Sequence, residues 1–339
     1  MKKILGKRLL GWLLALVLVC SVTNPAVTVD AAAKTPVQKY GRLSVDGTQL
    51  VDKKGNPVQL KGVSSHGLSW YPEYMTYDSM KYMRDKWGVE VIRLAMYTAE
   101  YNGYCTGDTQ NQKTLRSKVY HCVRDAKKLG LYVIIDWHIL SDGNPQTYQK
   151  QAKTFFKTMA KKYKDYNNVI YEICNEPNSG TSWVQIKSYA KSVIKTIRTY
   201  DKDGVILVGT PTWSQMVDQA AADPIKGYKN LMYTLHFYAA THTDWLRNTV
   251  ENAYDQGLPI FVTEYGICDA SGNGAVNTTE ADKWMKLLDR YQISSCIWNL
   301  SNKNESSALI KADCTKKTGW KSSDLSQSGK WFVKMMKKG

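Results

Sequence analysis

The chain of 339 residues contains little proline and glycine, 9 and 23 residues, and no proline- or serine-rich linker. This scarcity, with 43% hydrophobic residues, excludes collagen-like and disordered chains. Because no such linker is present, the sequence gives no sign of a second module. The length is compatible with two average domains or with one α/β barrel, because barrels of roughly 250 residues or more are routinely single domains.

Long hydrophobic runs are also scarce. The run at residues 9–20 is shorter than the ~20 residues needed to span a bilayer. Four basic residues precede it and small residues follow it, which is typical of a cleaved secretory signal. We therefore expect residues 1–33 to be a signal peptide and the protein to be secreted, extracellular and without a stable membrane anchor. A permanent anchor and lipidation at Cys20 are weaker interpretations, since bulky Val19 precedes that cysteine.

No basic run is interleaved with aromatic residues. Removing residues 1–33 takes away four cations and one anion, which lowers the net charge from +16 to +13. Such a charge can favour nucleic acid or acidic polymers. However, the lysines are scattered or lie on amphipathic segments such as residues 153–164, which indicates a solvated surface. We expect a monomer that binds no nucleic acid.

The sequence contains no C-x-x-C pattern. Six cysteines follow residue 33, and an even number in a secreted protein permits disulfides. A chain of this size does not need them, so the sequence leaves their pairing open.

Short runs rich in β-branched residues alternate with longer amphipathic runs. The short runs are apolar enough to be strands covered on both faces. Crossovers of this length force parallel pairing, and eight such units close a barrel. We therefore predict an α/β fold, a single (β/α)8 TIM barrel over residues 34–339. The predicted strands are residues 58–65, 89–97, 132–138, 169–177, 205–210, 231–238, 259–266 and 295–300, and the predicted helices lie near 78–87, 113–129, 147–163, 183–200, 213–221, 243–256, 279–291 and 328–337. Turn signals at Asp46-Gly47 and Gly55-Asn56 predict an N-terminal β-hairpin within residues 43–58 that caps the base of the barrel.

The predicted strands end in polar side chains. Chemistry on this fold gathers at the carboxyl ends of the strands, and buried charges there must satisfy each other or a ligand. These residues are His66, Arg93, Tyr97, Asp136, His138, Asn175, Glu176, Trp213, His236, Tyr238, Glu264 and Trp298.

Two glutamates end the fourth and seventh predicted strands. These strands are expected on opposite sides of the ring, so that Glu176 and Glu264 face each other across its mouth. Glycoside hydrolysis needs such a pair, one carboxyl group to protonate the leaving oxygen and the other to meet the charge on the sugar carbon. Nearby Trp70, Trp213 and Trp298 offer stacking surfaces for sugars. The alternative is a pair of buried, salt-bridged structural glutamates.

Seven segments carry a resemblance to a known family. They are VIYEICNEP at 169–177, LHFY at 235–238 and FVTEYG at 261–266, with GVSSHGLSW at 62–70, VIRLAMY at 91–97, VIIDWHILS at 133–141 and KNESS at 303–307. These segments resemble glycoside hydrolase family 5, and most closely its bacterial secreted endo-β-1,4-glucanases, the cellulases. The resemblance runs in order through almost all of residues 40–335.

The resemblance implies a role for each matching residue. Glu176 is expected to be the general acid/base and Glu264 the nucleophile, in a retaining reaction with carboxyl groups roughly 5 to 5.5 Å apart. Arg93 and Tyr238 are expected to keep Glu264 ionised, and Asn175 to bind the sugar 2-hydroxyl. The cleaving subsite is expected to have His138 and His236 as polar walls and Trp298, with a cis bond to Asn299, as its floor. Tyr97 lies on the strand face of Arg93, and His66, Trp70, Trp213, Lys303 and Glu305 fit outer parts of the cleft.

The sequence departs from the family pattern at two positions, Tyr265 and Cys174, neither of which is expected to touch the chemistry. Other substrates remain open, namely mannan, xyloglucan, lichenan and mixed-linkage glucan, because substrate choice lies in loops such as residues 101–112 and 269–278. Flat aromatic platforms favour an unbranched β-1,4-glucan, cellulose or a related β-glucan, as the polysaccharide partner.

Two alternatives belong to other functional classes. A metal-dependent hydrolase could use His66, His138 and His236 as zinc ligands, although no His-x-His or His-Glu-x-x-His spacing occurs. A carbohydrate-binding protein without activity would also need aromatics, but it gives no reason for two opposed glutamates. We expect an enzyme with no metal and no cofactor.

Overall fold

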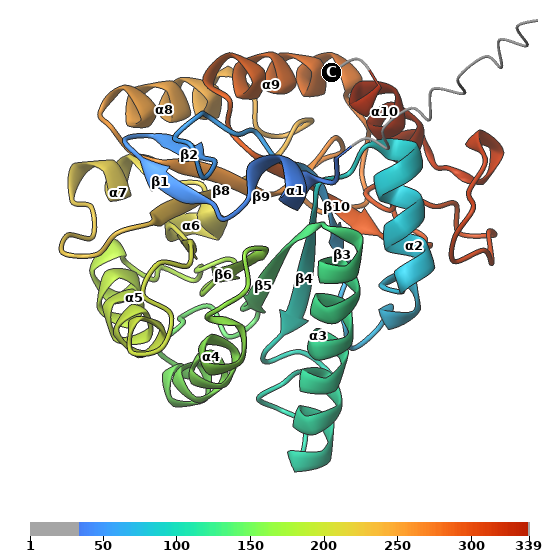
Figure 1. Ribbon diagram of the computed structural model, residues 1–339. Helices are drawn as coiled ribbons and strands as arrows, with labels where there is room; N and C mark the ends of the chain where they lie inside the picture. Colours follow the sequence, from blue (N-terminus) through green and yellow to red (C-terminus); the bar gives the residue numbers. More distant parts are fainter. Residues whose placement is uncertain (1–33, 338–339) are drawn as a thin grey trace, which may run out of the picture. The chain divides into compact units, whose positions relative to one another are not determined.

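The computed structural model describes residues 34–337, so the predicted signal peptide lies outside the described residues. Eight parallel strands close into a barrel in the order β10-β3-β4-β5-β6-β7-β8-β9, and helices surround it (Figure 1). This arrangement confirms the predicted (β/α)8 barrel. The barrel strands are β3 (Lys61–Ser65), β4 (Val91–Tyr97), β5 (Tyr132–His138), β6 (Val169–Glu172), β7 (Ile206–Val208), β8 (Leu231–Tyr238), β9 (Ile260–Gly266) and β10 (Ser295–Leu300).

The helices begin and end where the sequence provides capping residues. The side chain of Asp108 accepts a hydrogen bond from the backbone N–H of Asn111 at the start of α3, and Gly130 ends that helix in the left-handed conformation with φ at 66°. No helix in residues 34–337 is long and apolar enough to cross a membrane. The helices are α1 (Pro36–Tyr40), η1 (Pro72–Tyr74), α2 (Tyr77–Tyr82), η2 (Met83–Trp87), α3 (Thr109–Leu129), α4 (Gln149–Tyr163), α5 (Trp183–Arg198), α6 (Pro211–Ser214), α7 (Val217–Ala222), α8 (Asp244–Asp255), α9 (Thr278–Tyr291), η3 (Ser322–Asp324) and α10 (Gln327–Met336).

The base of the barrel is closed by an N-terminal hairpin, as predicted. Strands β1 (Ser44–Asp46) and β2 (Gln49–Val51) pair antiparallel, and Figure 1 shows them with α1 across one end of the barrel. Leu43 and Leu50 pack with inward-facing strand residues such as Ile134 and Phe261 in one buried cluster. This cluster fills the interior of the barrel near the hairpin. A larger hydrophobic cluster lies between the strands and the helices.

Several predicted elements differ in extent. The first barrel strand begins at Lys61 instead of residue 58, and the helix predicted near 78–87 is α2 followed by η2. The fourth strand ends at Glu172 instead of residue 177, so Asn175 and Glu176 lie on the connection after β6. The fifth strand is only Ile206–Val208. The helix predicted at residues 213–221 is two short helices, because Thr212, Trp213 and Ser214 have φ angles of 54° to 56°, which no continuous right-handed helix allows. Helix α1 was not predicted.

The structure also answers whether the cysteines form disulfides, which the sequence left open. All six cysteines among the described residues are free thiols. Burial raises the pKa of Cys105 and of Cys122 to about 12, so neither is a thiolate near neutral pH.

Candidate active site

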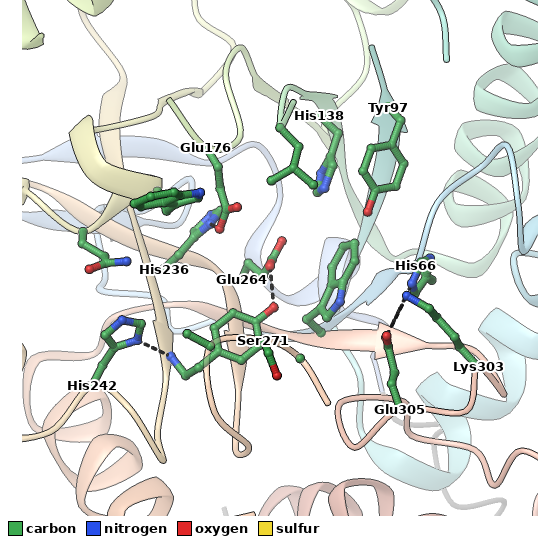
Figure 2. Close-up of a pocket in the computed structure, with 17 residues that line it drawn as sticks. His66, Tyr97, His138, Glu176, His236, His242, Glu264, Ser271, Lys303 and Glu305 are labelled. Carbon is green, nitrogen blue, oxygen red and sulfur yellow. Dashed lines mark hydrogen bonds and ion pairs between the residues drawn. The ribbon is translucent and has the colours of Figure 1, made fainter. Parts of the chain in front are cut away.

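A cavity of about 530 Å³ opens at the carboxyl ends of the barrel strands, where enzymes with this fold carry their active sites (Figure 2). Four of the predicted residues do not line it. Asp136 is fully buried beside His138, with Oδ2 2.6 Å from Nδ1 of that ring. Arg93, Asn175 and Trp70 lie behind its wall, against the lining residues Glu264, His138 and Tyr97. All the others line it: His66, Tyr97, His138, Glu176, Trp213, His236, Tyr238, Glu264, Trp298, Lys303 and Glu305.

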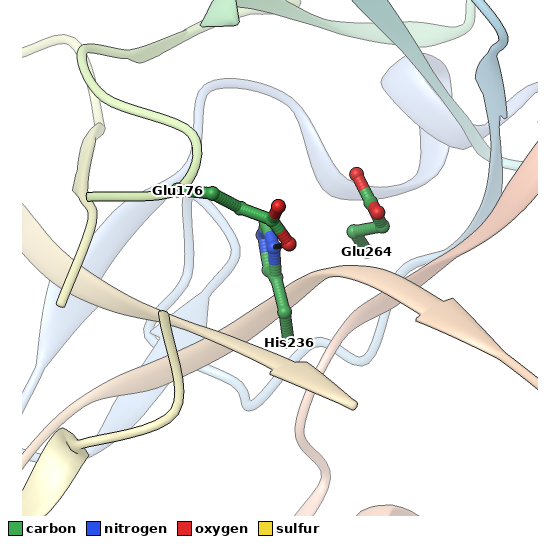
Figure 3. A group of neighbouring side chains, drawn as sticks. All are labelled: Glu176, His236 and Glu264. Atoms are coloured by element: carbon green, nitrogen blue, oxygen red, sulfur yellow. Dashed lines mark hydrogen bonds and ion pairs between the residues drawn. The ribbon is translucent and has the colours of Figure 1, made fainter. Parts of the chain in front are cut away.

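Glu176 and Glu264 converge inside this cavity (Figure 3). A carboxylate oxygen of Glu176 lies within 4.8 Å of one of Glu264. The two glutamates were expected to face each other across the mouth. Their strands, β6 and β9, have β7 and β8 between them on one side of the ring and four strands on the other. Glu176 reaches Glu264 from the connection after β6. The alternative of two buried, salt-bridged structural glutamates does not fit either. Both carboxyl groups border an open cavity, and the ion-pair partner of Glu176 is a histidine.

The carboxylate of Glu264 is held by two donors. Arg93 Nη1 donates to Oε2 at 3.0 Å, and the hydroxyl of Tyr238 donates to Oε1 at 2.8 Å. Burial raises the pKa of Glu264, but the positive charges of His236 and Arg93 and the Tyr238 hydrogen bond lower it more, so the pKa lies below its ordinary value. Glu264 is therefore an anion fixed in position.

Arg93 holds several acidic and polar side chains of the site in position. Its guanidinium is completely buried and forms a two-pronged ion pair with Glu172, with Nε to Oε2 at 2.7 Å and Nη2 to Oε1 at 3.0 Å. Burial raises the pKa of Glu172, yet the charge and hydrogen bonds of Arg93 and the charge of His236, whose Nε2 lies 3.9 Å from Oε1, bring it down to about 2. Our sequence reasoning missed Glu172. The available signal was a carboxylate inside an otherwise apolar strand.

Glu176 shares a proton with His236. His236 Nδ1 lies 2.9 Å from Glu176 Oε1, and its Nε2 lies 2.8 Å from the hydroxyl of Thr263, which donates to Glu172 at 2.8 Å. Because the Thr263 hydroxyl gives its proton to Glu172, it must accept from His236 Nε2–H, which leaves Nδ1 facing Glu176. Burial and the neighbouring Glu264 anion raise the pKa of Glu176, and the pair therefore retains a proton beside an ionised Glu264.

Aromatic rings form one wall of the cavity. The rings of His138 and Trp298 are nearly parallel, 10° apart in plane with centroids 5.3 Å apart, and Tyr97 packs against His138 edge-on at 4.3 Å. The peptide bond from Trp298 to Asn299 is cis, as expected. Trp70 stacks on Tyr97 from behind at 4.4 Å and donates its indole N–H to a backbone carbonyl, so it supports the wall.

Comparison with known proteins identifies this arrangement. The sequence model of the family described as "Cellulase (glycosyl hydrolase family 5)" matches residues 51–304. The chain belongs to glycoside hydrolase family 5.

Relatives and solved structures agree with this membership. The chain is 50% identical over 329 residues to an endoglucanase of Clostridium saccharobutylicum, covering 97% of this chain and 72% of that protein. It is 49% identical to endoglucanase A of Butyrivibrio fibrisolvens, covering 87% and 68%. The crystal structure of the catalytic domain of a Thermobifida fusca endoglucanase is similar, with a TM-score of 0.85 at 39% identity, covering 90% of this chain and 100% of that one.

Family 5 membership makes the protein a glycoside hydrolase and removes the non-catalytic alternative. The three-histidine metal site is also wrong. Among residues 34–337, the group close enough to share an ion is Glu176, His236 and Glu264, without His66 or His138. These three groups already hydrogen-bond to one another or to Arg93 and Tyr238, which explains their proximity.

Charged and aromatic side chains both line this family 5 cleft. Lys303 pairs with Glu305 at 2.7 Å, and His66 lies 3.5 Å from the same carboxyl group (Figure 2). Trp213 also belongs to the lining and is 45% exposed. The lining also includes Ala270, Ser271 and Gly272, from the loop 269–278 that the sequence associated with substrate choice. Sequence reasoning did not single out Leu140, Gln215 and His242, because they come from connections without a distinctive pattern.

Proposed function

We propose that the protein is a secreted, retaining endo-β-1,4-glucanase that hydrolyses internal bonds of cellulose and related β-glucans by double displacement. The observation that carries this proposal is the pair Glu176 and Glu264, whose carboxylate oxygens lie within 4.8 Å and whose pKa values shift in opposite directions. A separation near 5 to 5.5 Å is typical of retaining glycosidases, and inverting ones need roughly 6.5 to 9.5 Å to admit a water.

In the first step, ionised Glu264 attacks the anomeric carbon of the sugar and forms a glycosyl-enzyme ester. The bond from that carbon to the leaving oxygen breaks, and Glu176 transfers its proton to this oxygen. In the second step, Glu176 is a carboxylate and takes a proton from water as the water attacks the same carbon. Glu264 leaves as a carboxylate, so both groups return to their starting states.

The surrounding residues support each step. Arg93 and Tyr238 orient the attacking carboxylate through fixed hydrogen bonds, and a preoriented charge lowers the barrier without reorganisation. His236 holds the Glu176 carboxyl group and stabilises its anion after proton transfer. The indole of Trp298 offers a flat apolar surface to the sugar ring.

The preference for β-1,4-glucan rests on the relatives and on these aromatic surfaces. The curated relatives are named endoglucanases, and a variant of the Thermobifida fusca catalytic domain with one glutamate replaced by glutamine was solved with cellotetraose. That variant structure is 39% identical to this chain, with a TM-score of 0.84. The mannan, xyloglucan, lichenan and mixed-linkage alternatives share this catalytic arrangement.

The test is a panel of soluble polysaccharides with product lengths resolved over time. Carboxymethylcellulose and mixed-linkage glucan should be cut to a distribution of oligosaccharides, accompanied by a rapid fall in viscosity. Proton NMR should show the β-anomer first. Faster cleavage of mannan, release of a single short product, or an initial α-anomer would each overturn the corresponding part of the proposal.

We further propose that residues 1–33 are removed on secretion, that residues 34–339 form the catalytic domain, and that the protein acts as a monomer. N-terminal sequencing of protein collected from culture medium should begin near Lys34. Light scattering of that material should give the mass of one chain, and a dimer mass would refute the monomer.

A further inference from the structure

Helices α3, α4 and α5 carry the excess positive charge of the protein. Together they contain fifteen basic residues and one acidic residue, a net charge of +14. Residues 34–339 have a net charge of +13, so the part of this range outside the three helices is close to neutral. The lysines are spread along the sequence, but the fold collects most of the unbalanced charge on three consecutive helices.

These three helices are neighbours around the barrel (Figure 1). The ammonium group of Lys162 on α4 lies 4.8 Å from the ring centre of Tyr120 on α3. The ammonium group of Lys161, also on α4, lies 5.3 Å from the ring centre of Tyr200, which follows α5. The exposed sides of α3, α4 and α5 therefore form one surface, which we call the basic flank.

The lysines of α4 form a row without counter-charge. The row consists of Lys150, Lys153, Lys157 and Lys161, which recur every three or four residues. This spacing places them on one face of the helix, with about 5.4 Å between successive turns. Helix α4 contains no acidic residue, and none of the four lysines forms an ion pair within residues 34–337. Like charges at this spacing repel each other, so an anionic partner would stabilise the row.

A second row runs along α5. Lys187, Lys191 and Lys195 are four residues apart, and α5 also lacks acidic residues. Lys187 pairs with Asp223, whereas the other two lysines form no ion pair in the described part of the chain. Two neighbouring rows of ammonium groups match a linear polymer with regularly repeated anions better than one small anion.

The side chains of the basic flank favour other polyanions over nucleic acid. Its three arginines already bond to Tyr104, Asp125 and backbone carbonyls, so the free charge belongs to lysines. Lysine lacks the planar fork with which arginine binds a phosphate at two points. Tyr120, Tyr166 and Tyr200 each have a lysine ammonium group over the ring, which leaves less of each ring for bases to stack on.

An anionic membrane is also a poor match. A helix that lies on a membrane buries an apolar face below the headgroups. On α3, α4 and α5, the strongly exposed large apolar side chain is Val184 alone, at the start of α5. The basic flank therefore offers charge without an apolar face to insert.

We propose that the basic flank binds acidic polysaccharides, chains of uronic acid whose carboxylates repeat along the polymer. The choice of this polyanion rests on the proposed function, which puts the protein outside the cell among polysaccharides. The α4 row does not line the cavity that holds Glu176 and Glu264. The bound polymer therefore leaves the cleft free for neutral glucan, and it concentrates the enzyme where both polysaccharides occur together.

The test is binding of the purified protein to immobilised polygalacturonate. Binding is expected at low salt, and the affinity should fall about tenfold or more between about 50 and 200 mM salt, because each contact releases counterions. Fully methyl-esterified polygalacturonate has the same backbone without the charge and should not bind. Equal binding to the esterified polymer, or none to polygalacturonate at low salt, would overturn the proposal. Tighter binding to duplex DNA or to phosphatidylserine vesicles would overturn the choice of partner.

A pair of matched variants tests the location of the binding surface. The first replaces all four lysines of the α4 row by glutamine, which keeps helix propensity, and its affinity for polygalacturonate should fall about tenfold or more. The control makes the same change at four exposed lysines of α9 and α10, namely Lys283, Lys286, Lys330 and Lys334. Both variants lose the same net charge, and the control should bind nearly as the parent does. Equal weakening in both would overturn the assignment to the basic flank.

Hydrolysis of a neutral soluble glucan separates this proposal from the proposed function. The α4 variant should keep the parent rate, which also shows that it is folded, and unchanged polygalacturonate affinity in this active variant would overturn the proposal. If it does not fold, Lys191→Gln combined with Lys195→Gln decides, and unchanged affinity there would have the same meaning. A parent protein that binds polygalacturonate but cleaves no glucan would refute the glucanase and leave the binding surface standing.

Discussion

The hydrogen bond from Tyr238 to Glu264 should contribute to the position of the acid limb of the pH profile. Tyr238→Phe removes the donor that lies 2.8 Å from Oε1 and leaves the ring in place. A hydrogen bond to a charged group stabilises it by about 1.5–3 kcal/mol, and one pH unit corresponds to about 1.36 kcal/mol. The acid limb of kcat/KM should therefore move upward by about one to two pH units.

The sign follows from the role of the charge. Glu264 attacks only as a carboxylate, and the Tyr238 hydrogen bond contributes to its lowered pKa. Without that donor the carboxylate takes up its proton at a higher pH, so activity is lost earlier as the pH falls. The alkaline limb reports the loss of the proton from Glu176, whose pKa is raised by burial and by Glu264, and it should move much less.

The assay is kcat/KM on a soluble β-glucan measured across the pH range in which the variant remains folded. Tyr265→Phe is the matched control, because this buried tyrosine adjoins Glu264 in sequence and its hydroxyl has no hydrogen-bond partner. A Tyr238→Phe acid limb that coincides with those of the parent and of Tyr265→Phe would refute our account of how Glu264 stays ionised.

Three further predictions concern the carboxylates and the base of the barrel. Glu264→Gln should abolish turnover while oligosaccharide binding, measured by calorimetry, persists; near-normal activity would contradict the nucleophile assignment. Glu176→Ala should slow glucan hydrolysis by ~10² to 10⁴ but spare aryl glycosides with activated leaving groups, and equal losses on both would exclude the acid role. Leu50→Ala, at a position 2% exposed, should cost about 2–5 kcal/mol in denaturant unfolding without altering kcat/KM; a stability change below 1 kcal/mol would contradict the packing described.

The barrel could be predicted because its signal is local and repeated. Each strand is a short apolar run and each helix an amphipathic one, and parallel pairing then follows from crossover length. The extent of β6 could not be predicted, because Ile173 and Cys174 continue the apolar run beyond Glu172, where β6 ends. The kink at Trp213 was equally hidden, since its φ of 54° is unusual for a residue with a side chain.

The candidate site was predictable as a set of residues but not as a network. Strand ends carry most of the lining residues, so the fold alone brings them together. The partners of Arg93 come from three other strands or connections, with Glu172, Asn175 and Glu264 lying 79, 82 and 171 positions away in sequence. No local pattern encodes these distances, which is why the contacts of Glu172 and Thr263 were found only in the structure.

The hairpin closes one end of the barrel, and the carboxylates lie at the other end. Its leucines pack with the lower layers of the barrel, whereas the carboxylates sit at the far ends of the same strands. Engineering for heat tolerance can therefore concentrate on the hairpin and its contacts, while altered selectivity can be sought at the rim. Substitutions in the two regions should change the free energy of unfolding additively, because distant sites without shared partners contribute independently.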